Sequence, residues 1–295
     1  MKFTHRWRRA AATTCSVLAL LALGACGTSS SEDGSGGPLK MGLPPGEANP
    51  EFQEQFTPLR DLISKAAGRP VETTLTSDYL AIVEAMRSEL IDIAAFSPFP
   101  TPLAQSVAGV KPLVVAKGAP YSSVLVCRTD RGIDSIDDLR GRTVAFVDPG
   151  STSGNYIPKL LLKRAGINPE TDIEATYAGG HDTAQLAVKQ GSADCAADAR
   201  TSYEEMVEKG VIDGDQQKII TESEPIPVSL VIIARKGLDP EVERAVVDEL
   251  VNGDNGKALE VIHAKSFAKA TDADFTLFRE AARELGVDLE ELSRQ

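Results

Sequence analysis

From Leu39 onward the chain alternates short apolar runs with longer amphipathic segments, and this pattern constrains the fold more than any other feature. Apolar runs of about four to eight residues are typical of strands, whereas apolar residues at helical spacing are typical of helices packed against a sheet. Strands that are joined through helices form right-handed crossovers and pair in parallel. The pattern therefore predicts an α/β protein with mainly parallel sheets.

The expected elements follow one another through most of the chain. Strands are predicted at residues 40–43, 71–74, 91–96, 112–116, 122–127, 143–146, near 173, at 193–196 and at 228–234. Helices are predicted at 51–67, at 78–89, at 136–139, from the loop at 150–154 through about 165, and at 182–190. The tail from Pro240 to Leu292 also has a helical pattern and is predicted to form helices.

The N-terminal segment is not expected to belong to this fold. Four basic residues within 1–9 precede an apolar stretch at 10–23, which is short for a membrane span and has the proportions of a secretory signal. It ends in Leu23-Gly24-Ala25-Cys26, which resembles the bacterial lipobox, whose cysteine is diacylated and becomes the new N-terminus. We predict a signal peptide at 1–25, lipidation of Cys26, and anchoring to the outside of the bacterial cell membrane. The alternative is an ordinary signal peptide cleaved near Ala25, with Cys26 incidental.

The residues after the predicted signal peptide and the net charge limit which partners are expected. Residues 27–38 are mostly Ser and Gly, with two acids and no large apolar residue, so 26–38 is predicted to be a lipidated, flexible tether. Removal of 1–25 takes away four cations and no acids, so the net charge of −12 becomes about −16. A strongly acidic body argues against binding to nucleic acid or to an anionic membrane surface.

Two of the four cysteines remain in the predicted fold. Cys15 leaves with the signal peptide and Cys26 carries the lipid, whereas Cys127 and Cys195 each lie in a predicted strand. In an exported protein this pair forms either a disulfide or two buried thiols, and the sequence leaves both open. No Cys/His cluster, Walker loop or dinucleotide glycine motif occurs, so neither a metal nor a cofactor is predicted.

Two junctions between a strand and a helix carry candidate binding chemistry. In the first, from Asp148 to Asn155, glycines allow close backbone approach, and Ser151, Thr152 and Ser153 present three hydroxyls. The second is Gly179-Gly180-His181-Asp182-Thr183, which places His181 at the start of a helix. Free N–H groups and the helix dipole suit both positions to an anion, and both would lie beyond the carboxyl ends of strands, where α/β sheets bind ligands.

Each junction also has a purely structural interpretation. Ser, Thr and Gly are common helix caps, and a single histidine near a helix start is often a cap or a packing residue. Asp182 is expected to cap its helix or to support the site. Because the two junctions occur together in consecutive βα units, about 30 residues apart, they favour a site for a small oxyanion.

Several stretches resemble the phosphonate-binding proteins of ABC importers, also described as the phosphate/phosphite/phosphonate-binding family. They follow in order Ser77-Asp78-Tyr79, 82–87, 91–94, 120–126, 150–154, 180–183, 186–188, Ala193-Asp194 and 225–227. The resemblance implies a type II periplasmic-binding fold, in which two α/β lobes close on a ligand around a hinge. The lobes are predicted at 39–121 with 229–295, and at 122–228.

The resemblance also implies roles for individual residues. Ser151, Thr152, Ser153 and His181 would hold the phosphorus-bound oxygens. Tyr79 and Tyr121 would add hydroxyls or aromatic walls from the other lobe and the hinge, and core packing is the alternative for both.

Further pocket candidates are Ser97, Thr201 and Ser229. Family members that bind aminoalkylphosphonates pair the ligand ammonium with carboxylates, and by motif offset Thr201 and Ser229 occupy those places here. The missing carboxylates indicate a ligand with a small or uncharged substituent, namely phosphite, methylphosphonate or phosphate, with a larger phosphonate left open.

We therefore expect a monomeric, extracytoplasmic solute-binding lipoprotein that captures a small anion and delivers it to an ABC permease with a cytoplasmic ATPase. An enzyme is not expected, because the Gly-x-Ser-x-Gly elbow of serine hydrolases would need a serine at Thr152. Two alternatives keep the fold. One is another small ligand such as an organic sulfonate, and the other is sensing on behalf of a membrane receptor.

Overall fold

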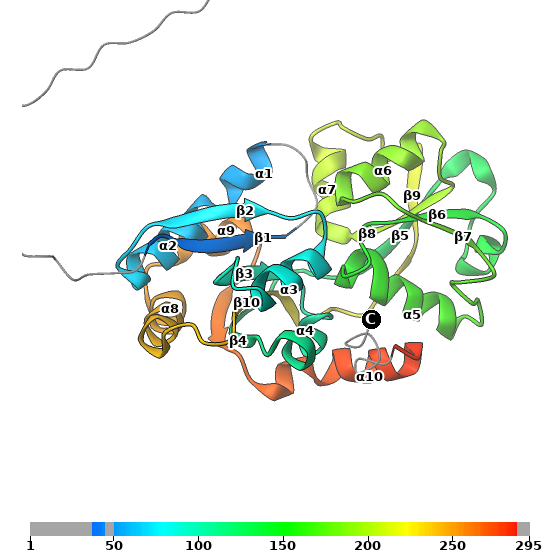
Figure 1. Cartoon of the computed structure of the whole chain (residues 1–295). Coiled ribbons are helices and arrows are strands. Elements are labelled where there is room, and N and C mark those ends of the chain that lie inside the picture. The colour runs from blue at the N-terminus through cyan, green and yellow to red at the C-terminus, as the bar shows by residue number, and fades with distance from the viewer. Residues whose placement is uncertain (1–36, 45–49, 288–295) are drawn as a thin grey trace, which may run out of the picture. The chain divides into compact units, whose positions relative to one another are not determined.

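The computed structural model describes residues 37–44 and 50–287, so the predicted signal peptide, Cys26 and residues 27–36 of the tether lie outside the described residues. Within this part, two β-sheets with helices on their faces form two α/β lobes (Figure 1). The α/β prediction is thus confirmed. None of the helices in these two ranges is long and apolar enough to cross a membrane.

The first sheet has six strands in the order β11-β4-β10-β3-β1-β2. These strands are β1 (Leu39–Leu43), β2 (Val71–Leu75), β3 (Ile93–Phe96), β4 (Lys111–Lys117), β10 (Val228–Ala234) and β11 (Ser266–Lys269). The helices that accompany them along the chain are α1 (Pro50–Gln55), α2 (Thr57–Ala67), α3 (Tyr79–Arg87), α4 (Thr101–Ala108), α8 (Pro240–Asn252), α9 (Gly256–Val261) and α10 (Thr276–Leu285), with a 3₁₀ turn η4 (Asp272–Phe275).

The second sheet has five strands in the order β7-β6-β8-β5-β9. These strands are β5 (Ser123–Arg128), β6 (Thr143–Phe146), β7 (Glu174–Tyr177), β8 (Cys195–Ala199) and β9 (Gln217–Glu222). Its helices are α5 (Ile157–Arg164), α6 (His181–Gln190) and α7 (Arg200–Glu208), with 3₁₀ turns η1 (Thr129–Arg131) and η2 (Ile136–Leu139) and a π-helical turn η3 (Thr152–Tyr156).

Both sheets are mixed, so the expected parallel pairing holds for part of each sheet. Strands β1, β2 and β3 pair in parallel, as do β6, β7 and β8. In contrast, β10 runs antiparallel to β3 and β4, and β5 runs antiparallel to β8 and β9. Strands β5 and β10 lie where the chain passes between the sheets, so no βαβ crossover sets their direction, and β11 runs antiparallel to β4 at the edge of the first sheet.

The two connections between the sheets lie side by side. One joins β4 to β5 through residues 118–122, and the other joins β9 to β10 through 223–227. They are tied together where the Ile226 N–H donates to the carbonyl of Tyr121 at 2.8 Å. These short connections leave Tyr121 between the two lobes.

The hydrophobic core lies on both faces of each sheet. Side chains alternate along β3, so Ile93 faces the cluster formed with α2 and α8, whereas Phe96 faces the cluster formed with α3 and α10. The second of these clusters also contains Ile157 and Leu160 of α5. The core therefore continues from the first sheet to a helix of the second lobe.

Two predicted helical segments differ from the structure. Residues Ser266–Lys269 form β11 on the open edge of β4, so the tail contains a strand besides the predicted helices. Only Phe267 of this strand is buried, which leaves too short a pattern to distinguish an edge strand from a helix. The predicted helix at 51–67 is divided at Phe56, because Pro58 starts α2.

Candidate functional site

The loop after β6 presents the three predicted hydroxyl residues directly before α5. Ser151, Thr152 and Ser153 are each at most 3% exposed, and the π-helical turn η3, which begins at Thr152, leads into the helix. A Cβ on Gly154 would lie only 2.3 Å from Cγ2 of Val147. The glycine therefore allows the loop to fold back onto the end of β6.

Ser151 has the capping role that the sequence left open. Its Oγ accepts a hydrogen bond from the Gly154 N–H at 3.0 Å. A serine hydroxyl that accepts one bond still has its own hydrogen to donate. Capping is thus compatible with a bond from Ser151 to a ligand oxygen.

Thr152 and Ser97 connect the two lobes at this loop. Their hydroxyl oxygens lie 2.6 Å apart, and the Thr152 N–H donates to Ser97 Oγ at 3.1 Å. The Phe99 N–H donates to Thr152 Oγ1 at 2.9 Å. Ser97 therefore lies at the predicted site, and the hydroxyl of Thr152 bonds both to the side chain and to the backbone of the other lobe.

Tyr79 and Tyr121 meet the same hydroxyls. Ser97 acts on the pKa of Tyr79, and Ser153 and Thr152 act on that of Tyr121, so these side chains lie close to the two phenols. Burial raises the pKa of Tyr121 to about 12 and raises the pKa of Tyr79 as well, so both phenols stay protonated and can donate. Tyr79 also packs edge-to-face on Phe96, so its packing role and its place in the site coexist.

These residues form a connected group of hydroxyls from both lobes. We refer to Tyr79, Ser97, Tyr121, Thr152 and Ser153 as the hydroxyl cluster. Sequence motifs more than 70 residues apart along the chain supply its members, and the structure brings them together. Hydroxyls suit an oxyanion because each can turn a hydrogen toward a ligand oxygen.

His181 begins α6 and is held by a buried carboxylate. Its Nδ1 lies 2.5 Å from Oδ1 of Asp198, which is fully buried at the end of β8. Because a carboxylate only accepts, Nδ1 is the donor in this pair. Asp198 also accepts from Gln185 Nε2 at 2.8 Å and from the Ala199 N–H at 2.6 Å. Sequence reasoning did not single out Asp198 and missed this contact.

Asp148 is a second buried acid at the site. It is 2% exposed and accepts from the Gly150 N–H at 2.7 Å. Burial raises the pKa of Asp148, and the charge of Asp78 adds to this, whereas the Gly150 N–H, the Tyr79 backbone and His181 lower it. The interaction with His181 links this acid to the second junction. No group of three or more His, Cys, Asp or Glu residues that could hold a metal occurs in residues 37–44 and 50–287.

The two remaining pocket candidates lie in different settings. Thr201 is partly exposed in the first turn of α7, directly after β8. Ser229 lies at an irregularity in the pairing of β10 with β4, and its hydroxyl is buried without a hydrogen-bond partner among the described residues. A buried hydroxyl of this kind needs a partner, which a ligand or a water molecule can supply.

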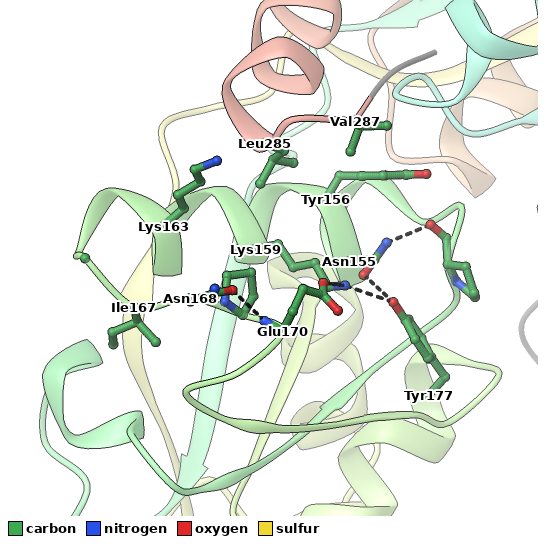
Figure 2. A pocket seen from close by; sticks show the side chains of 13 residues that line it. Asn155, Tyr156, Lys159, Lys163, Ile167, Asn168, Glu170, Tyr177, Leu285 and Val287 are labelled. Atoms are coloured by element: carbon green, nitrogen blue, oxygen red, sulfur yellow. Dashed lines mark hydrogen bonds and ion pairs between the residues drawn. The ribbon is translucent and has the colours of Figure 1, made fainter. Parts of the chain in front are cut away.

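A cavity of about 650 Å³ lies on the α5 side of the hydroxyl loop (Figure 2). Its lining includes Asn155, Tyr156, Lys159 and Tyr177, and none of the six predicted ligand residues is among the described residues that line it. Lys159 Nζ donates to Glu170 at 2.7 Å and to the Tyr177 hydroxyl at 3.2 Å. The charge and the hydrogen bonds of these two partners outweigh burial and raise the pKa of Lys159. Because no member of the hydroxyl cluster is among the described residues that line it, the cavity is separate from that cluster.

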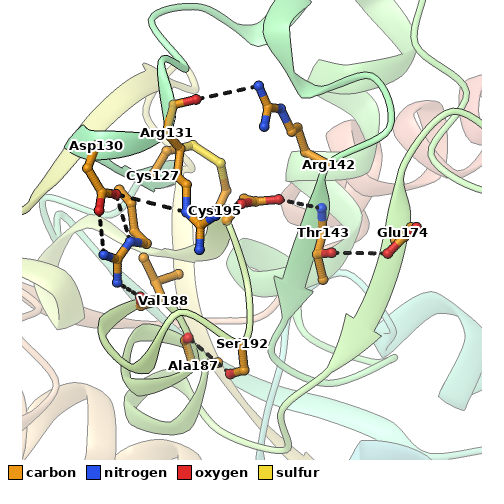
Figure 3. Close-up of polar contacts among 12 residues, drawn as sticks. Cys127, Asp130, Arg131, Arg142, Thr143, Glu174, Ala187, Val188, Ser192 and Cys195 are labelled. Atoms are coloured by element: carbon orange, nitrogen blue, oxygen red, sulfur yellow. Dashed lines mark hydrogen bonds and ion pairs between the residues drawn. A yellow bond between two sulfur atoms is a disulfide. The ribbon is translucent and has the colours of Figure 1, made fainter.

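Cys127 and Cys195 form a disulfide between the antiparallel neighbours β5 and β8 (Figure 3). Both cysteines are fully buried. The bond closes a segment with a sequence separation of 68 residues, which contains the hydroxyl loop and His181. Of the two arrangements that the sequence left open, the structure contains the bonded one.

The fold and the site together define a class of protein. Two α/β lobes are joined by adjacent connections, and hydroxyls from both lobes meet between them, as in type II periplasmic substrate-binding proteins. The family described as "ABC transporter, phosphonate, periplasmic substrate-binding protein" matches residues 41–275. The chain belongs to this family, as the sequence motifs predicted.

Curated relatives and solved structures agree with this assignment. The chain is 36% identical over 258 residues to the "Phosphate-import protein PhnD" of Mycolicibacterium smegmatis, with 78% of each chain covered. It is 27% identical to the "Phosphonates-binding periplasmic protein" of Escherichia coli, over 72% of this chain and 65% of the relative. The fold is similar to that of PhnD1 from Prochlorococcus marinus in complex with methylphosphonate, with a TM-score of 0.74, 19% identity, and coverage of 85% of this chain and 98% of the other.

Proposed function

We propose that this protein captures a small phosphorus oxyanion outside the cytoplasm and delivers it to an ABC importer, without chemical conversion of the ligand. Phosphite, methylphosphonate and phosphate are the ligands that fit best, because each offers a compact set of oxygens to the hydroxyl cluster. The single observation that carries the proposal is the convergence of Thr152 and Ser153 from one lobe with Ser97 and Tyr79 from the other. Closure of the lobes would exclude water and strengthen these hydrogen bonds.

Six residues are proposed to contact the ligand. They are the predicted set Tyr79, Tyr121, Ser151, Thr152, Ser153 and His181. Ser97 and Ser229 are proposed to lie at the edge of the pocket, since Ser97 is bonded to Thr152 and the Ser229 hydroxyl lacks a described partner. Thr201 is proposed as the third edge residue. With Thr201 and Ser229 in place of carboxylates, we expect no strong binding of an aminoalkylphosphonate ammonium group.

The lobe boundaries and the anchoring are part of the same proposal. We propose lobes at 39–121 with 229–295, and at 122–228, with a signal peptide at 1–25 and a lipid on Cys26. The protein would act as a monomer tethered to the membrane by residues 26–38. Cells that produce the protein can be grown with a radioactive fatty acid to test the anchor. The wild-type protein should carry the label, and a Cys26→Ser variant should not.

Isothermal titration calorimetry tests the ligand. The chain from Ser29 onward would be refolded to remove bound anion and titrated with phosphite, phosphate, methylphosphonate and 2-aminoethylphosphonate. We expect tight binding of at least one of the first three and weak binding of the fourth. Tight binding of 2-aminoethylphosphonate would contradict the argument from Thr201 and Ser229, and an absence of binding by all four would contradict the proposed function.

Two variants connect the binding to the site. Ser153→Ala removes one hydroxyl from the cluster and should weaken binding about tenfold or more, since a lost hydrogen bond to a charged group is worth about 1.5–3 kcal/mol. Ser192→Ala is the matched control, because Ser192 is exposed and its one described side-chain bond is to a carbonyl of the preceding helix α6, that of Ala187. An equal loss in both variants would contradict the assignment of the site.

A further inference from the structure

The charges beside the hydroxyl cluster are unusual for an anion site. Asp148 and Asp198 are both buried, at 2% and 0% exposure. In the described part of the chain, the groups that act most strongly on the pKa of Asp148, Tyr79 and Tyr121 include no lysine or arginine. His181 is the basic side chain that acts on Asp148, and it is itself bonded to Asp198. An oxyanion that enters this site meets two buried acids and one histidine.

The two acids differ in their remaining capacity for hydrogen bonds. Asp198 accepts three described bonds, from His181, Gln185 and the Ala199 N–H, and these fix the orientation of the imidazole. Asp148 accepts one described bond, from the Gly150 N–H, and the nearby backbone of Tyr79 also lowers its pKa. A carboxylate has about four acceptor positions, so Asp148 has room for another donor. Asp148 also lies three residues before Ser151, on the loop that presents the hydroxyls.

We propose that Asp148 determines specificity, by accepting a hydrogen bond from a ligand P–OH group and so selecting phosphorus oxyanions that carry a proton over sulfonates that carry none. This inference rests on the proposed function. Methylphosphonate monoanion and methanesulfonate have the same shape, the same charge and three oxygens each. Only the phosphonate has a hydrogen to donate, whereas a sulfonate oxygen would face the ionised carboxylate of Asp148.

A sulfonate could bind only if Asp148 took up a proton first. That step becomes tenfold less favourable for each pH unit above the pKa of the acid. The titratable groups that act on Asp148 in the described structure are Asp78, Tyr79, Tyr156 and His181. Because a change in their ionisation acts on two ligands of equal charge alike, the ratio of the two affinities isolates Asp148.

Calorimetry with the matched pair tests the inference. At mildly acidic pH, where methylphosphonate is a monoanion, the wild-type protein should prefer it to methanesulfonate by about 10- to 100-fold, the effect of one unpaired buried acceptor. Asp148→Asn keeps an oxygen for the Gly150 N–H and adds an amide donor, so the ratio should fall below about 3-fold, mainly through a gain for methanesulfonate. Asp198→Asn is the control, because it should weaken both ligands by a similar factor and leave the ratio unchanged.

A second measurement needs no variant. As the pH falls toward the raised pKa of Asp148, the wild-type ratio should become smaller, since a protonated Asp148 can donate to the sulfonate. A wild-type protein that binds both ligands equally, or an Asp148→Asn protein with the wild-type ratio, overturns the role of Asp148. Wild-type protein that binds no phosphorus oxyanion overturns the proposed function itself, and with it this inference.

Discussion

Gly154 fixes the position of the hydroxyl loop, because a Cβ there would lie 2.3 Å and 2.4 Å from side-chain atoms of the buried Val147. Gly154→Ala must therefore move either the loop or the end of β6. We expect the variant to lose about 1–3 kcal/mol of unfolding free energy and to bind the oxyanion at least about tenfold more weakly, as measured by urea denaturation and calorimetry. Gly256→Ala is the control, since nothing lies within 4 Å of a Cβ at that position. Equal stability of the two variants would contradict the tight packing of the loop.

Asp148 also has a consequence for stability. Burial raises its pKa in the folded protein, so the folded state binds this proton more tightly than the unfolded chain does. The carboxylate therefore destabilises the fold at neutral pH, and this penalty disappears as the pH falls below the ordinary pKa of 3.8. We expect Asp148→Asn to have a higher melting temperature than the wild type at pH 7, and the two melting temperatures to converge near pH 3. A lower melting temperature of the variant at pH 7 would show that the acceptor role toward backbone N–H groups dominates.

Some residues of the site could be predicted from the sequence around them, and others could not. Ser151, Thr152 and Ser153 form a local run beside glycines, so they could be singled out from the sequence. The role of Asp198 depends on its contact with His181, which lies 17 residues earlier on a different element. Strands β6 and β8 are parallel neighbours, so their carboxyl ends meet at one edge of the sheet. A correct prediction of this pairing would have placed Asp198 near the site.

The same limit applies to helices and strands. Strands β6 and β10 have the predicted bounds, 143–146 and 228–234, because runs of mostly buried apolar residues define them. The edge strand β9 and the helices α4 and α7 were not predicted. Strand β9 begins with Gln217 and Lys218 and is mostly only partly buried, so its pattern is weak. Its pairing with β5, rather than its own composition, makes it a strand.

The bond between β5 and β8 yields a prediction for these elements. A disulfide that closes a segment of this length stabilises a protein by about 2–5 kcal/mol. We expect reduction of Cys127–Cys195 to lower the unfolding free energy by this amount in denaturant titrations with and without a reductant. The variant in which both cysteines are replaced by alanine is the control and should not respond to the reductant. If the wild type is equally stable in both conditions, the bond is not formed in the protein in solution.

Across the whole molecule, two of the polar contacts between the lobes should differ in strength. Thr152 bonds to Ser97 and to the Phe99 N–H in a buried setting, whereas Arg164 pairs with Glu284 at 57% and 39% side-chain exposure. Exposed ion pairs contribute about 0–1 kcal/mol, whereas a buried N–H left without a partner costs about 1–3 kcal/mol. Thr152→Val should therefore open the ligand-free protein, and Arg164→Gln should not.

Small-angle X-ray scattering of the ligand-free protein measures this difference directly. A free-energy change of about 1.4 kcal/mol shifts the ratio of open to closed molecules tenfold. If the wild type is mainly closed, Thr152→Val should therefore have a larger radius of gyration than the wild type. Arg164→Gln should have the wild-type radius, because solvent screens the pair that it removes. If the wild type is as extended as Thr152→Val, the hydroxyl of Thr152 does not hold the lobes together before the ligand arrives. Closure would then depend on the oxyanion, whose oxygens would have to compete with Ser97 and Phe99 for this hydroxyl.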